Sequence, residues 1–73
     1  MGGNVRSNPL RQKMKLILET FDSISRQNGI VEKDLLLSAL YGKINVDEAE
    51  ELMTYLIKEG ILKLTETGIV EKP

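Results

Sequence analysis

A chain of 73 residues with 41% hydrophobic and 29% charged residues holds at most one small folded domain. It contains neither cysteine nor histidine, which excludes disulfides, thiolate or imidazole metal sites, and Ser–His–Asp or Cys–His catalysis. Ten basic against eleven acidic residues give a net charge of −1, so no overall positive charge attracts nucleic acid. No apolar run exceeds three residues, so neither a membrane span nor a signal peptide is expected.

Residues 1–8 are polar and glycine-rich, and we expect a flexible leader or linker remnant ahead of a domain over residues 9–72. Asn8 is the expected N-cap of a helix with Pro9 at its first position. Apolar residues then recur at spacings of three and four until Gly29, which can adopt the left-handed conformation that stops a helix at low cost. The pattern predicts a helix over residues 9–28 with a buried stripe of Leu10, Met14, Ile17, Leu18, Phe21 and Ile24.

A short edge strand and a second helix are expected next. Ile30-Val31 is a β-branched pair, and the residues from Asp34 to Leu40 are apolar almost all round. A helix of that kind is typical of the middle of a small core. Gly42 is expected to end it, and the next helix begins about four residues later, which predicts a helix-turn-helix.

The sequence at the start of the third helix matches a capping box, with Asn45 as N-cap and Glu48 expected to reach back to it. It should end at Gly60. The phase of its apolar stripe predicts that Tyr55 is exposed. The residues expected to be buried are Val46, Ala49, Leu52, Met53, Leu56 and Ile57.

Two short strands close the chain. They cover Ile61–Thr65 and Gly68–Glu71, and Gly68 can supply the positive φ that a tight hairpin needs. The expected order is therefore helix, short strand, helix, helix, hairpin. This order predicts a mainly α fold with a small β-hairpin, the winged helix-turn-helix.

The exposed face of the third helix does not have the composition of a DNA reader. Residues 46–59 carry five acidic side chains and one lysine, a net charge of −4. Acids favour a helix N-terminus, which explains Asp47 and Glu48, but the face also lacks arginine and asparagine. Phosphate repulsion would oppose its approach to DNA, so we expect weak or no binding to nucleic acid.

Positive charge gathers instead at the start of the first helix, where Arg11, Lys13 and Lys15 precede any acidic residue. These three are candidates for a weak phosphate contact, and the alternative is a solvated end of a linker. No catalytic residue, metal ligand or cofactor site is expected. The Gly42-Lys43 pair lacks the upstream glycine of a P-loop, and the carboxylates cluster on a solvent face.

A candidate partner surface combines apolar residues that lie off the buried stripes with the exposed face of the third helix. On a helical wheel Leu16 lies away from the first helix's stripe, and Leu37 and Tyr41 form a second face on the second helix. The alternative is that these are isolated exposed side chains without a role. The residues of this candidate surface are Leu16, Leu37, Tyr41, Glu51 and Tyr55.

From Arg11 to Lys72 the chain resembles the C-terminal winged-helix domain of archaeal minichromosome maintenance (MCM) replicative helicases. The similar segments are the basic helix start over residues 11–18, Asp22-Ser23-Ile24, residues 46–52 and the junction over residues 56–62, with Gly68 in the wing and a basic end at Lys72. The wing over residues 64–70 lacks the aromatic, proline-rich ending common in that family.

The resemblance implies a non-catalytic regulatory or protein-interaction module of a hexameric helicase active in DNA replication. Its partners would be the parent's AAA+ ATPase module and replication proteins, in the cytoplasm near the nucleoid. We expect the isolated domain to be monomeric and not membrane-bound. The alternatives are a small winged-helix transcription regulator that binds duplex DNA and a scaffold domain of a multisubunit complex.

Overall fold

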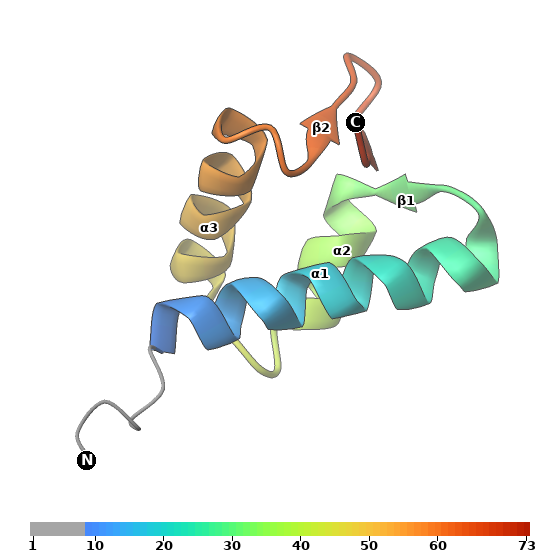
Figure 1. The fold of residues 1–73 in the computed structure, drawn as a ribbon. Helices are drawn as coiled ribbons and strands as arrows, with labels where there is room; N and C mark the ends of the chain where they lie inside the picture. The colour runs from blue at the N-terminus through green and yellow to red at the C-terminus, as the bar shows by residue number, and fades with distance from the viewer. Residues whose placement is uncertain (1–8) are drawn as a thin grey trace.

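A computed structural model describes residues 9–73, which are mainly helical with a small antiparallel sheet (Figure 1). The expected leader and the N-cap Asn8 lie outside the described residues. In Figure 1 the long first helix crosses the front of the molecule, and the later elements stand behind and above it. The elements are α1 (Pro9–Asn28), β1 (Val31–Glu32), α2 (Lys33–Leu40), α3 (Val46–Lys58), β2 (Lys63–Leu64) and β3 (Ile69–Glu71).

The predicted helix boundaries are largely confirmed, and the local chemistry explains them. Gly29 directly follows α1 and has a φ of 78°, and Gly60 follows the C-cap Glu59 of α3 and has a φ of 81°. The Asn45 side-chain oxygen accepts hydrogen bonds from the backbone N–H groups of Asp47 at 2.9 Å and Glu48 at 3.4 Å. Asn45 is therefore the N-cap, as predicted.

The expected capping box is wrong in its second half. The Glu48 carboxylate does not reach back to Asn45, because it binds the Lys13 ammonium on α1 with an Nζ–Oε2 distance of 2.6 Å. A charged partner forms a stronger hydrogen bond than a neutral backbone amide does. Glu48 therefore links α3 to α1 and does not complete the N-terminal cap of α3.

The sheet has the strand order β1-β3-β2, so β3 is central and both its neighbours are antiparallel to it. Val70 pairs with Val31 on one side and with Leu64 on the other. Gly68, with φ 85°, forms the tight turn before β3, as the sequence predicted. β1 is shifted by one residue from the expected pair Ile30-Val31. The other two strands are shorter than expected: Ile61, Leu62 and Thr65 lie outside β2, and Gly68 precedes β3.

One apolar core lies where the three helices meet the sheet. It confirms most predicted positions, but four apolar residues expected inside are exposed: Leu10, Leu35, Ala39 and Val46. Leu10 lies in the first turn of α1, at the end of that helix that is away from the sheet (Figure 1). In α2 only one face is covered by the rest of the fold, which leaves Leu35 exposed. The buried set is Ile17, Phe21, Ile24, Val31, Leu36, Leu37, Leu40, Ile44, Ala49, Leu52, Met53, Leu56, Leu62 and Val70.

Candidate functional site

The outward face of α3 is acidic. Because the buried residues Leu52, Met53 and Leu56 fix the phase of the helix, the opposite side points to solvent. Its lower part is a shallow hollow lined by Asp47, Glu50, Glu51 and Thr54, and the exposed Tyr55 and Lys58 follow toward the end of the helix. We call these six residues the acidic face.

The predicted phosphate contact at the start of α1 is only partly available. The Lys13 ammonium is bound by Glu48, and Lys15 lies 4.0 Å from Glu19 one turn along the same helix. Arg11 is exposed and forms no ion pair within the described residues. Of the three cations, Arg11 and Lys15 therefore stay accessible to an anion, and Lys13 is held by the protein itself.

The predicted partner surface does not exist as one patch. Leu37 is only 4% exposed, because α2 turns that side toward the core, and Leu16 is half-buried against the same core. Both were expected to face outward, and both expectations are wrong. Tyr41, Glu51 and Tyr55 are exposed as predicted, with Tyr41 just after α2 and the other two on the acidic face.

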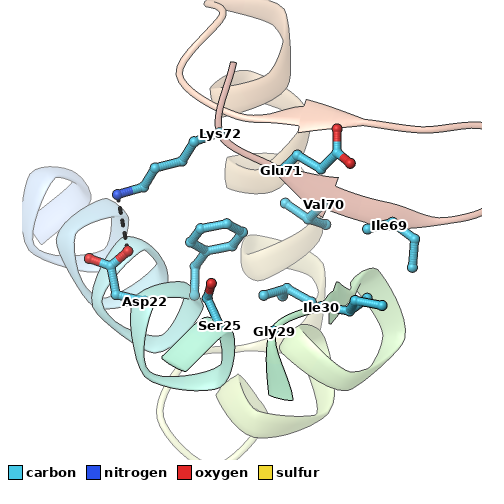
Figure 2. Close-up of a pocket in the computed structure, with 10 residues that line it drawn as sticks. Asp22, Ser25, Gly29, Ile30, Ile69, Val70, Glu71 and Lys72 are labelled. Carbon is cyan, nitrogen blue, oxygen red and sulfur yellow. Dashed lines mark ion pairs between the residues drawn. The ribbon is translucent and has the colours of Figure 1, made fainter. Parts of the chain in front are cut away.

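A groove that the sequence did not indicate lies between the second half of α1 and the sheet (Figure 2). Its volume is 310 Å³, and its base consists of the buried side chains of Phe21, Val31 and Val70. In Figure 2 Lys72 reaches from the end of β3 to Asp22, with an Nζ–Oδ1 distance of 3.0 Å. The further lining residues are Ser25, Gly29, Ile30, Ile69 and Glu71.

Lys72 has two partners on α1. Besides the ion pair with Asp22, its ammonium lies 5.8 Å from the centre of the Phe21 ring, within the range of a cation–π contact. The sequence analysis named Lys72 only as a basic end of the wing and predicted no partner for it. The structure instead joins residues that are far apart in the chain, for which local spacing gives no signal.

Within residues 9–73 the structure contains no group of three or more acidic side chains placed to hold a metal ion. Every buried side-chain nitrogen or oxygen of that region has a hydrogen-bond partner. None of the helices α1, α2 and α3 is long and apolar enough to cross a membrane.

Three features of the surface are thus available for contacts: the acidic face of α3, the two accessible cations at the start of α1, and the groove beside the sheet. The chain matches no known protein family, and no curated protein or solved structure is similar enough to indicate a relative.

Proposed function

We propose that residues 9–72 form a winged-helix domain that acts as a regulatory, protein-interaction module and binds duplex DNA weakly. The element order supports the fold assignment, since two helices joined by a short turn are followed by a β-hairpin. In a winged helix of this order α3 would be the helix that enters the major groove.

The acidic face of α3 is the observation that carries this proposal. Asp47, Glu50 and Glu51 are all exposed on the side that would meet DNA, and only Lys58 at the end of the helix is basic. A specific reader needs cations to bind phosphates and donors to read the edges of bases. Carboxylates in those places repel the backbone before base contacts form, whereas they are compatible with a protein partner.

The proposed setting is a replicative helicase of the MCM type. It is supported by the sequence resemblance that spans Arg11 to Lys72. In that setting the domain would be an accessory of the ATPase module and would adjust ATP hydrolysis, unwinding or the recruitment of replication proteins.

A small transcription regulator is the second candidate, and one observation favours it. Arg11 and Lys15 stay accessible at the start of α1, and such cations can contact phosphates at the edge of a binding site. Lys63 on β2 is also exposed. These charges alone give affinity without sequence preference, so this candidate would need base contacts from α3.

Removal of residues 9–73 from the helicase that carries this chain tests the proposed setting. The truncated hexamer should still hydrolyse ATP and unwind DNA, with altered rates, because no step of the chemistry would depend on the removed residues. A matched control keeps the domain and carries Glu66→Gln, an exposed position in the turn before β3 that lies outside the acidic face and the core. Complete loss of hydrolysis in an intact hexamer, or rates identical to those of the full chain, would contradict a regulatory accessory role.

A further inference from the structure

A row of basic side chains runs along the outer flank of α1. On a helical wheel of about 100° per residue, Arg11, Lys15 and Asp22 lie within about 40° of one another. The Asp22 carboxylate holds the Lys72 ammonium at an Nζ–Oδ1 distance of 3.0 Å (Figure 2). Lys72, which follows β3, is thereby added to the basic residues of the helix. We call Arg11, Lys15 and Lys72 the cation row.

The cation row has a length that suits several phosphates. At about 1.5 Å per residue, Arg11 and Lys15 are about 6 Å apart along the helix axis, and Asp22, which marks the position of Lys72, lies about 10 Å further on. Phosphates of one DNA strand advance by about 3.4 Å per nucleotide along the axis of a duplex. The row therefore spans about five phosphates of one strand.

The surroundings of the cation row fit the backbone of a duplex better than a protein or a single strand. Leu10 is the exposed large hydrophobic residue of α1, and it belongs to the buried stripe and not to the outer flank. Protein interfaces depend on buried apolar and aromatic anchors, and single strands stack on exposed rings. Phe21, the aromatic residue of α1, is only 5% exposed. The row thus offers cations alone, which is the chemistry of phosphate contacts.

Asp22 is the carboxylate that limits the cation row. The side chains of its ion pair with Lys72 are 44% and 55% exposed, and pairs between side chains this exposed are weak. The other acid next to Lys72 is Glu71, which lies opposite Lys63 in the register of β2 and β3. A phosphate can therefore replace Asp22 at the Lys72 ammonium, and the released carboxylate then repels the DNA beside it.

Lys13 does not belong to the cation row. On the same wheel it lies about 160–180° away from the row, on the side that faces α3. Its ammonium is 2.6 Å from Glu48 and its side chain is 32% exposed, whereas Lys15 is 75% exposed and 4.0 Å from Glu19. The packing of the helices thus exchanges Lys13 for Lys72 as the third candidate for a phosphate contact.

We propose that Arg11, Lys15 and Lys72 form one binding site for the phosphate backbone of duplex DNA, and that Asp22 lowers its affinity by competing with phosphate for Lys72. The inference rests on the weak DNA binding proposed above and names the residues that cause it and the one that limits it. The site gives affinity without sequence preference, because phosphates are the same at every base pair.

The test measures the affinity of the 73-residue chain for a short DNA duplex between about 20 and 100 mM salt. Three phosphate contacts predict that log affinity falls against log salt with a slope of about −2.7. Lys72→Met should weaken binding about two- to five-fold and should reduce the steepness of the slope by about 1. Lys72→Arg retains the cation and should bind as the unchanged chain does.

Asp22→Asn should have the opposite effect and strengthen binding about two- to five-fold, because it removes the competing carboxylate. A gain of this kind cannot result from unfolding, so the test remains decisive if Lys72→Met is unstable. Glu66→Gln, which removes one negative charge in the exposed turn before β3, is the control for Asp22→Asn. Lys13→Met, which removes a cation outside the row, is the control for Lys72→Met and should leave the slope unchanged.

Three results would overturn the proposal: an unchanged slope for Lys72→Met, a slope reduced by Lys13→Met as much as by Lys72→Met, or a gain from Asp22→Asn no larger than that from Glu66→Gln. If weak binding through Arg11 and Lys15 persists in those cases, only this inference fails and the proposed weak DNA binding stands. Tight binding through residues 46–58 would instead contradict the proposed function itself.

Discussion

The two halves of α1 differ in what they contribute to the molecule. The second half, from Ile17 onward, buries Ile17, Phe21 and Ile24 and forms one wall of the core. The first half contains no fully buried residue, and Leu10 on the same stripe is 50% exposed. The apolar periodicity is nevertheless continuous through both halves. A periodic stripe therefore predicts which side of a helix can be buried, and the length of the neighbouring elements decides how much of it is.

The ion pairs of the two halves differ in the same way. Lys13 in the first half binds Glu48 at the start of α3, and Asp22 in the second half binds Lys72 after the last strand. The first pair engages Lys13, which the sequence analysis had named as a candidate phosphate contact. The second connects the end of the chain to the core helix and borders the groove. Charge clusters in a sequence thus overstate the charge that is free to bind a ligand.

The largest expected effect comes from the core side of α1. Phe21→Ala should lower the free energy of unfolding by about 3–5 kcal/mol, because it removes a ring that is 5% exposed. That loss is similar to the whole stability of about 3–5 kcal/mol expected for so small a domain, so the variant should be largely unfolded. Leu10→Ala should change stability by less than about 0.5 kcal/mol.

Urea unfolding, monitored by circular dichroism, measures the free energy of unfolding of Phe21→Ala and Leu10→Ala. Ile17→Val is the milder change at a fully buried position and should lower stability by about 0.5–1.5 kcal/mol, which stays measurable if Phe21→Ala does not fold. Equal effects of Leu10→Ala and Ile17→Val would contradict the difference between the two halves.

Much of the fold follows from local signals in the sequence. Pro9 and Gly29 bracket α1, Asn45 caps α3, and Gly68 forms the turn before β3, because each residue has a backbone preference that acts within a few positions. The sequence could not show which leucines of α2 are buried, because leucines lie on several sides of that helix. Only the packing of α1 and α3 selects Leu36 and Leu37 for the core and leaves Leu35 exposed.

The surfaces were less predictable than the helices. The acidic face of α3 was visible in the sequence, because its residues belong to one helix. Lys13 and Glu48 are 35 positions apart, and the groove combines α1 with two strands that the sequence placed only roughly. Neither can be derived from spacing, since both depend on how the elements pack.

Asn45→Ala should have the next largest effect, a loss of about 0.5–2 kcal/mol, because it removes the acceptor for two backbone N–H groups of α3. Asn45→Asp retains an acceptor and is the control. Loosening the start of α3 also loosens Glu48, so amide exchange should accelerate in the first half of α1 and not in the second. Uniform acceleration along α1 would contradict the independence of its halves.

The ion pairs should have the smallest effects. Lys13→Met and Lys72→Met should each lower stability by about 0.2–1 kcal/mol, since all four side chains of the two pairs are at least 32% exposed. Both losses should shrink at high salt. Lys63→Met, at an exposed lysine outside these pairs, is the control. Losses above about 2 kcal/mol would show that the pairs are structural supports of the fold.

Titration of the ¹⁵N-labelled chain with duplex DNA tests the central claim, that α3 does not read DNA. We expect binding near 10⁻⁴ M that weakens steeply with salt, with the amide shifts centred on the accessible Arg11 and Lys15. Replacing both with glutamine should abolish it. Salt-resistant binding below about 10⁻⁶ M, with the largest shifts in residues 46–58, would contradict the claim and favour the transcription regulator.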